Sequence, residues 1–140
     1  MASSKAFHHK YIISLRDTDA AGVLFSGNLV AICHIGYEAM MTSLNMSLAS
    51  VFKNREYGLP VVHTECDFRK PLTVSDEIDI AVSIAEVGKT SYRVKYECRN
   101  RDGEICATAS IVHVCIEANN YKPQRIPAQL RSALENYLES

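Results

Sequence analysis

The sequence predicts an α+β domain in which a curled, five-stranded antiparallel sheet wraps around one long helix. From Leu29 to Leu44, apolar residues recur at helical spacing, which indicates a helix with one apolar stripe. One strand-like segment precedes this helix and four follow it. Runs of strands after a helix are typical of α+β domains rather than of a parallel, doubly wound sheet. Because the stripe is almost entirely apolar, we expect the sheet to curl around the helix.

Turn signals separate the expected strands. Pro71 ends the second strand because proline cannot donate to a sheet ladder. Gly88-Lys89 forms the next turn, and Arg101-Asp102-Gly103-Glu104 is a strong hairpin turn. The last strand is the richest in apolar residues, so we expect it to be central. The expected strands are Phe7 to Arg16, Val61 to Arg69, Ile78 to Ile84, Tyr92 to Cys98 and Ile105 to Glu117.

Two shorter helices complete the prediction. Asn28 is a candidate N-cap for the long helix. A second helix is expected from Leu48 to Arg55, before Gly58-Leu59-Pro60, and a third from Ala128 to Leu138, after a loop with two prolines. A five-stranded sheet in so short a chain leaves edges and one face to cover. We therefore expect a homo-oligomer, either a dimer or a larger assembly.

Composition excludes several classes of function. The 140 residues fit a single domain, 1–140. The net charge is -1 and the basic residues are scattered, whereas a nucleic-acid-binding protein needs a basic stripe. No apolar run reaches the roughly 18 to 20 residues of a membrane helix, and the N-terminus does not look like a secretory signal. We expect a cytoplasmic protein that binds neither nucleic acid nor membrane.

The five cysteines predict neither a disulfide framework nor a metal site. Their number is odd, and no two form a Cys-x-x-Cys pair. Cys33 and His34 are adjacent on the expected helix, whereas two helical ligands would stand three or four residues apart. We expect buried free thiols in a reducing compartment and no metal.

The segment from Asp17 to Gly22 is the one most suggestive of chemistry. Asp17 and Asp19 are two residues apart at a strand end, so their carboxylates are expected on the same side. The start of the long helix follows, where free backbone amides carry about half a positive charge. Such amides can stabilise an oxyanion. On the residues alone, however, aspartates before a turn and a helix are more commonly caps and turn formers.

A resemblance gives this segment a more specific meaning. Arg16-Asp17-Thr18-Asp19-Ala20-Ala21-Gly22-Val23, followed by Asn28 and an amphipathic helix, resembles the signature of the 4-hydroxybenzoyl-CoA thioesterase family. The likeness spans residues 8 to 118. It implies a hotdog fold, dimers paired into tetramers, an active site at a subunit interface, and hydrolysis of an acyl-CoA thioester. Three further segments resemble the 1,4-dihydroxy-2-naphthoyl-CoA hydrolases of phylloquinone and menaquinone biosynthesis, namely Cys33 to Glu38, Leu59 to His63 and His113 to Ile116.

The resemblance also assigns the central roles. The second aspartate of the pair, Asp19, is implied to be catalytic, either attacking the thioester to give a mixed anhydride or activating a water. Asp17 would order the loop. The backbone amide that polarises the thioester carbonyl maps to Ser26, with Gly27 as a second donor. Many relatives carry an aromatic residue and another small one at these two positions, and a backbone donor tolerates that change. No cofactor is implied, because coenzyme A is part of the substrate.

Substrate-binding residues are less sharply indicated. His34 and Glu38 are spaced for an i, i+4 pair on the helix, and a structural role for His34 is the alternative. His63 resembles a histidine of the naphthoyl-CoA hydrolases and could hydrogen-bond a substrate hydroxyl. His113, on the last strand, is expected to be a core histidine with satisfied hydrogen bonds.

Coenzyme A needs cations for its phosphates. Lys89, with Thr90 and Ser91, aligns with a basic, hydroxyl-bearing turn that the benzoyl-CoA relatives use for the nucleotide, although an ordinary solvated hairpin is an equal alternative. Arg69 and Lys70 could supply part of that charge. Lys122 and Arg125 are a lower-ranked choice.

Three rival functions remain at this point. The chain could hydrolyse another aryl- or fatty-acyl-CoA, since apolar pockets discriminate weakly. It could be a non-catalytic acyl-CoA-binding module, which would not need Asp19. A dehydratase would have to combine His34 or His63 with Glu38, and no motif of that class is present.

Overall fold

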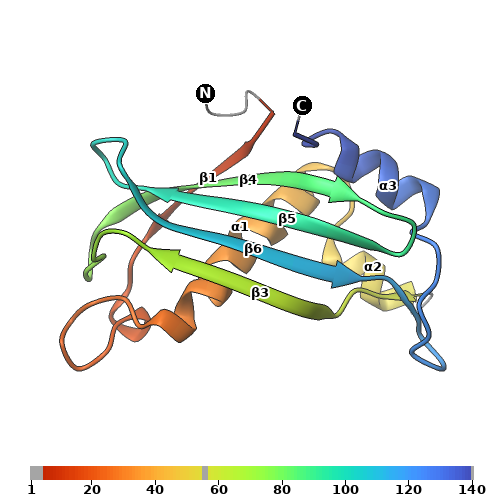
Figure 1. Ribbon diagram of the computed structural model, residues 1–140, viewed down its shortest axis with the longest axis horizontal. Coiled ribbons are helices and arrows are strands. Elements are labelled where there is room, and N and C mark those ends of the chain that lie inside the picture. Colours follow the sequence, from red (N-terminus) through yellow and green to blue (C-terminus); the bar gives the residue numbers. More distant parts are fainter. Residues whose placement is uncertain (1–4, 55–56, 140) are drawn as a thin grey trace.

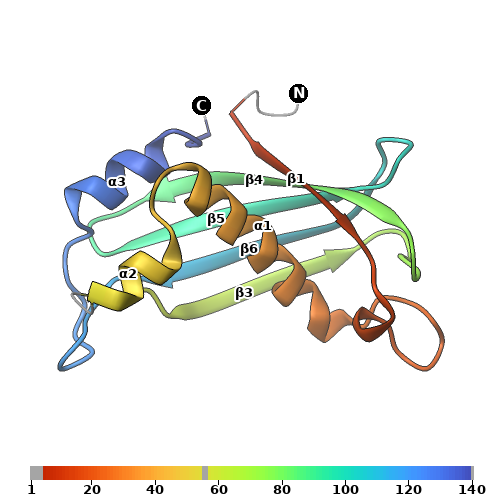
Figure 2. The ribbon, with the colours of Figure 1, turned by 180° about the vertical axis from the view of Figure 1, so that it is seen from behind.

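The computed structural model describes residues 5–54 and 57–139. Its main sheet has five antiparallel strands in the order β1-β4-β5-β6-β3, and β2 and β7 form a separate two-stranded ribbon. Helix α1 crosses one face of the main sheet diagonally (Figures 1 and 2). The strands are β1 (Phe7–Ile12), β2 (Tyr57–Gly58), β3 (Val61–Phe68), β4 (Glu77–Val87), β5 (Ser91–Arg99), β6 (Ile105–Val114) and β7 (Ile116–Glu117). The helices are α1 (Leu29–Ser43), α2 (Leu48–Asn54) and α3 (Ala128–Glu135), with 3-10 turns η1 (Leu15–Asp17) and η2 (Ser26–Asn28).

The core lies between α1 and the concave face of the sheet. The helix buries its apolar stripe, and alternate residues of β4, β5 and β6 point toward it. Gly36 marks the closest approach, because a Cβ atom there would lie 3.0 Å from Ile80 Cγ2 and 3.2 Å from Val82 Cγ2. The α+β prediction of a sheet curled around one long helix is confirmed.

The two edges of the sheet differ. On the β4 side, β1 covers the first half of the edge, and the C-terminal segment covers the rest: the Ile84 amide donates to Tyr137 O, and the Glu139 amide to Ile84 O, both at 2.8 Å. On the other side, β3 pairs only with β6 among the described residues, and nearly all its side chains are exposed. The β3 edge is therefore open to another chain.

Several boundaries differ from the prediction. The first strand ends at Ile12 instead of Arg16, because Asp17 folds back on Ser14 and closes a 3-10 turn. The last strand breaks at Cys115, whose amide turns aside to Thr90 O. It lies inside the sheet as expected, although β5 is the middle strand. Helix α3 ends at Glu135, since the residues beyond it join β4. Arg55, the expected end of the second helix, lies outside the described residues.

Within the described residues, no helix has the length and apolar character needed to cross a membrane.

Candidate functional site

Asp17 is a buried structural carboxylate. Only 7% of it is exposed, and its Oδ2 accepts hydrogen bonds from the Tyr11 hydroxyl (2.6 Å), the Ser14 amide (2.9 Å) and the Ser14 hydroxyl (3.0 Å). Burial raises the pKa of Asp17, but the hydrogen bonds from Tyr11 and Ser14 lower it more, so the net pKa lies below its ordinary value. These contacts fit the loop-ordering role that the sequence assigned to Asp17.

Asp19 differs from Asp17 in its exposure to solvent. It is exposed at the start of a tight turn, where its amide donates to Val23 O and its own carbonyl accepts from the Gly22 amide, both at 2.9 Å. Gly22 permits this turn because its φ of 78° lies in the left-handed region. One carboxylate oxygen of Asp19 accepts from the Ala21 amide at 2.8 Å. The expectation that both carboxylates point to the same side is wrong, because η1 turns Asp17 into the protein.

The start of α1 is fastened to this loop. Asn28 does occupy the N-cap position, but its side chain makes no capping bond. Its amide nitrogen donates instead to Asp17 O at 2.9 Å, and the Phe25 amide donates to the same oxygen at 3.0 Å. The capping role predicted for Asn28 is therefore wrong: its side chain holds the aspartate loop against the helix.

Ser26 and Gly27 form the first turn of η2. Their amides precede the first helical hydrogen bond, which runs from the Asn28 amide to Phe25 O, so neither has an intrahelical acceptor. Both residues are exposed. A Cβ atom at Gly27 would lie 2.5 Å from Cε2 of the Phe25 ring, so a side chain at position 27 would displace that ring. Among the described residues, neither amide has an assigned acceptor, and both stand in the same loop as Asp19, which suits them to polarise a carbonyl.

A hollow of about 360 Å³ adjoins this loop. Ser26 lines it from the helix side, and Phe68, Arg69 and Lys70 line it from the end of β3. Arg69 is exposed and forms no ion pair within the described part of the chain, whereas Lys70 is paired with Glu104. Of the two cations considered for the nucleotide, Arg69 is the more available.

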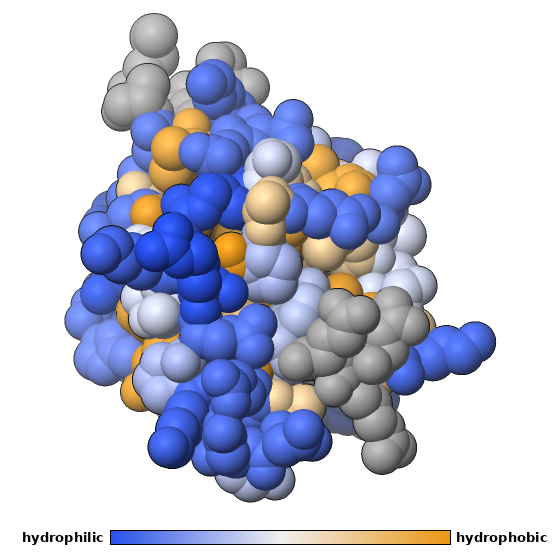
Figure 3. Space-filling view, turned by 90° about the vertical axis from the view of Figure 1, so that its right-hand side faces the viewer, coloured by the Kyte–Doolittle hydropathy of each residue, from blue (hydrophilic) through white to orange (hydrophobic). Residues whose placement is uncertain are grey.

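The predicted coenzyme-binding turn lies elsewhere. Lys89, Thr90 and Ser91 connect β4 to β5 at one end of the sheet, on the right in Figure 1, while the aspartate loop lies at the opposite end. Figure 3 views the right-hand end, whose surface is mostly hydrophilic with small apolar patches. The Lys89 carbonyl accepts a hydrogen bond from the Ile126 amide, and the Thr90 carbonyl accepts one from the Cys115 amide. The Lys89 side chain is exposed. Within one chain, Lys89 and Asp19 are not brought together.

The predicted substrate-binding residues are divided between two places. His34 and Glu38 line a hollow of about 170 Å³ between α1, α2 and the start of β3, which His113 also lines. No hydrogen bond joins His34 to Glu38 within the described residues, although the charge of Glu38 acts on His34. His63 is exposed on β3, with its Nε2 atom 2.7 Å from Glu65 Oε1.

His113 was not identified from the sequence as a candidate site residue. It is buried, as expected of a core histidine, but its Nε2 atom has no partner within the described part of the chain. The same holds for His34 Nε2. Alternation along the last strand placed His113 inward, but no sequence signal shows that α1 brings His34 and Tyr37 to it.

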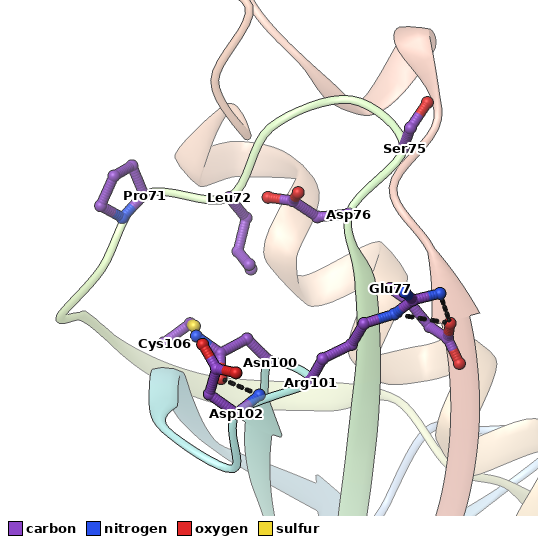
Figure 4. Close-up of a pocket in the computed structure, with 9 residues that line it drawn as sticks. All are labelled: Pro71, Leu72, Ser75, Asp76, Glu77, Asn100, Arg101, Asp102 and Cys106. Atoms are coloured by element: carbon purple, nitrogen blue, oxygen red, sulfur yellow. Dashed lines mark hydrogen bonds and ion pairs between the residues drawn. The ribbon is translucent and has the colours of Figure 1, made fainter.

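A third hollow, of about 380 Å³, lies between the loop after β3 and the β5–β6 hairpin (Figure 4). Arg101 and Glu77 face it and pair with each other at 2.7 Å. Asp76 accepts from the Thr73 amide, and the Asp102 amide donates to the Asn100 side chain. Because these polar groups are engaged locally, we do not assign this hollow a ligand.

Comparisons with known proteins identify relatives of this chain. The chain is 31% identical over 134 residues to a 1,4-dihydroxy-2-naphthoyl-CoA hydrolase of Trichodesmium erythraeum, covering 94% of this chain and 97% of that protein. It is 32% identical over 130 residues to the hydrolase of the same name from Synechococcus elongatus, covering 92% and 95%. The crystal structure of a 1,4-dihydroxy-2-naphthoyl-CoA thioesterase from Synechocystis has a TM-score of 0.87 at 27% identity, with 92% and 95% of the two chains covered.

The hotdog fold is thus shown by both sequence and structure. A family model described as the thioesterase-like superfamily matches residues 13–134, which include the aspartate loop, α1 and every strand of the main sheet except β1. The chain belongs to the thioesterase-like superfamily.

Proposed function

We propose that this protein hydrolyses 1,4-dihydroxy-2-naphthoyl-CoA to 1,4-dihydroxy-2-naphthoate and CoA, a step of phylloquinone or menaquinone biosynthesis. The observation that carries the proposal is the exposed carboxylate of Asp19, fixed by a tight turn in the same loop as the Ser26 and Gly27 amides, which precede the first helical hydrogen bond. The names of the relatives from Trichodesmium, Synechococcus and Synechocystis support the choice of substrate.

The chemistry follows from these groups. The Ser26 and Gly27 amides would donate to the thioester oxygen and stabilise the charge that develops there. Asp19 would either attack the carbonyl carbon, so that the thiolate of CoA leaves and water cleaves the resulting anhydride, or take a proton from the water that attacks. Either route needs a carboxylate that solvent and substrate can reach, and exposure of Asp19 meets this requirement. Neither route uses a metal or a cofactor.

A complete site requires a second subunit in this proposal. The β3 edge is open, and Val61, Val62 and Phe68 expose 39%, 58% and 46% of their surface along it. Edge strands of this kind pair readily with another chain. If two copies paired antiparallel through β3, the Val61 end of each strand would meet the Phe68 end of the other. The partner subunit's Lys89 would then lie on the same side of the dimer as Asp19, because Ser91 and Val61 lie at the same end of the sheet.

This arrangement would bring the predicted coenzyme-binding residues and the catalytic loop into one site. Lys89, Thr90 and Ser91 of one subunit would hold the nucleotide of CoA, with help from Arg69 of the other, and Asp19 would reach the thioester. Light scattering should give the mass of a dimer or a tetramer. The five free thiols fit a reducing compartment such as the cytoplasm.

The decisive experiment replaces the carboxylate. In Asp19→Asn and Asp19→Ala, kcat should fall at least about 10²-fold, which is typical of losing a catalytic base or nucleophile, while circular dichroism and oligomeric mass stay unchanged. Asp102→Asn, a change at an exposed hairpin aspartate, is the matched control and should keep full activity. Retained hydrolysis in both Asp19 variants would contradict the assignment and favour a non-catalytic binding module.

The choice of acyl group needs its own test. A panel of CoA esters should be hydrolysed with the highest kcat/KM for hydroxylated aromatic acyl groups. Faster turnover of short aliphatic or fatty-acyl esters would reject the naphthoyl assignment and leave a thioesterase of different specificity.

A further inference from the structure

His113, a buried histidine, lines the hollow of about 170 Å³ between α1, α2 and the start of β3. One of its ring nitrogens has no hydrogen-bond partner within the described residues. The ring of His113 is stacked between Tyr37 (centroids 5.0 Å apart, 14° between planes) and Tyr92 (5.1 Å, 9°). The two tyrosine hydroxyls are 2.6 Å apart and hydrogen-bond to each other. His113 is 4% exposed, so the stack fixes both its position and its orientation.

The hydrogen bonds of His113 define what its free nitrogen can do. Its Nδ1 lies 3.0 Å from Leu59 O, and a carbonyl oxygen can only accept, so Nδ1 carries the proton. Burial, assisted by the nearby His34 and opposed by the bond to Leu59, lowers the pKa of His113, which keeps the ring neutral. Nε2 is then an acceptor, and it has no partner within the described residues. A buried acceptor without a partner is costly, so this atom calls for a donor.

His34 repeats the pattern from the helix side. Its ring centroid is 6.0 Å from that of His113, and its Nε2 is likewise buried without a partner among the described residues. Burial lowers the pKa of His34 despite the opposing charge of Glu38. Two neutral imidazoles and one carboxylate therefore converge on a single hollow.

The hollow itself suits an aromatic ring. Its volume is about 170 Å³, and an apolar cavity of about 150 Å³ is large enough for benzene. Apolar side chains form most of its wall. The apolar lining residues are Tyr37, Leu48, Phe52, Leu59 and Val61. Since Val61 belongs to the open β3 edge, the hollow lies at the end of the strand that would meet the partner subunit's Asp19.

We propose that this hollow binds the hydroxyl-bearing ring of the aromatic acyl group, with His113 Nε2 accepting a hydrogen bond from a ring hydroxyl and His34 as a second polar contact. The proposal rests on the proposed function and deepens it, because it makes His113 a specificity-determining residue. A ring with hydroxyl groups satisfies the unpaired nitrogens of His113 and His34, whereas an unsubstituted ring or an alkyl chain leaves them unpaired. Discrimination against the analogue without hydroxyls follows from that difference.

Kinetics test the specificity. For the wild type and for His113→Asn, kcat/KM is measured on 1,4-dihydroxy-2-naphthoyl-CoA and on 2-naphthoyl-CoA, which lacks both hydroxyls. An asparagine amide can still donate to Leu59 O but has no atom at the position of Nε2. The ratio of the two kcat/KM values should fall at least about tenfold in His113→Asn, as expected for one lost hydrogen bond to a buried acceptor. The hydroxyls also alter the reactivity of the thioester, so the ratio of kcat/KM values in one protein is not informative alone. The contribution of His113 is measured by the change in this ratio between the wild type and His113→Asn. His8→Asn, at an exposed histidine of β1, is the matched control and should leave the ratio unchanged.

Direct binding separates this proposal from the proposed function and remains informative if His113→Asn does not fold. Histidine labelled with ¹⁵N in the ring is introduced into Asp19→Asn, and the His113 Nε2 resonance is followed by NMR. Saturating 1,4-dihydroxy-2-naphthoate should move this resonance toward that of a hydrogen-bonded nitrogen, whereas 2-naphthoate should not. A shift without hydrolysis of any aryl-CoA by the wild type would support the pocket and reject the function. If the wild type hydrolyses aryl-CoA but the His113 Nε2 resonance does not move, the proposed binding of the ring hydroxyl is rejected and the proposed function is retained. The same conclusion holds if a bound water has already shifted the resonance before the ligand is added.

Discussion

The carboxylate of Asp17 should hold a large share of the local stability, although it is not the catalytic group. Removing it in Asp17→Ala leaves the Tyr11 hydroxyl and the Ser14 amide without their acceptor. Hydrogen bonds to a charged group are worth roughly 1.5–3 kcal/mol each, but Tyr11 and Ser14 are only half-buried and can recover part of this from water. We therefore expect the free energy of unfolding to fall by about 2–4 kcal/mol.

The effect should also depend on pH in a defined direction. The pKa of Asp17 in the folded protein lies below its ordinary value of 3.8, because hydrogen bonds outweigh burial. Such a group stabilises the fold fully above the unfolded pKa, and the stabilisation is lost as pH falls through the folded pKa. The difference in unfolding free energy between the wild type and Asp17→Asn should therefore be constant near neutral pH and shrink below about pH 4.

Urea denaturation followed by circular dichroism measures both effects. Tyr11→Phe removes one of the hydrogen bonds that lower the pKa of Asp17 and keeps the carboxylate, so it should lose about 1 kcal/mol and show a weaker acid sensitivity than the wild type. A loss below about 0.5 kcal/mol in Asp17→Ala would mean that the carboxylate is solvated in solution, since ordinary surface substitutions have effects of that size. If the difference in unfolding free energy between the wild type and Asp17→Asn is the same at pH 3 and pH 7, the argument from the pKa of Asp17 is refuted.

Two further outcomes follow from the geometry. Gly36→Val should destabilise the protein by about 1–3 kcal/mol, because α1 approaches β4 too closely for a side chain; a thermal melt with an unchanged midpoint would show that the helix can move away. Lys89→Ala should raise KM for CoA thioesters with little change in kcat, and the effect should weaken as salt increases. If Lys89→Ala and the wild type have the same KM at low salt, the β4–β5 turn is an ordinary solvated hairpin.

The sequence predicted the elements that depend on periodicity. The apolar stripe from Leu29 to Leu44 and the alternating pattern of the strands correspond to α1 and the main sheet, because burial on one side dictates both patterns. Boundaries failed where side chains bond to the backbone. Asp17 closes η1 through Ser14, and Asn28 reaches back to Asp17 O rather than capping its own helix. Such local alternatives compete with regular structure and leave no periodic signal.

The candidate site was predictable only in part, for a related reason. Asp19, Ser26 and Gly27 are close in the chain, so one motif could point to all three. His113 and His34 are distant in the chain and meet because α1 packs across the sheet, close to β4 at Gly36. No pattern along the sequence reports that crossing, and the stacked partners of His113 were therefore not foreseen.

The candidate site residues are divided between the two ends of β3, and this division would have a functional consequence. Asp19 and the helix amides stand at the Phe68 end of β3, whereas Lys89 and the His34–His113 hollow stand at the Val61 end. Pairing through β3 would join one set from each subunit, because antiparallel strands place unlike ends side by side. It would also bury the exposed valines and fill the open edge. The feature that makes the isolated chain prone to association is thus the one that would complete its chemistry.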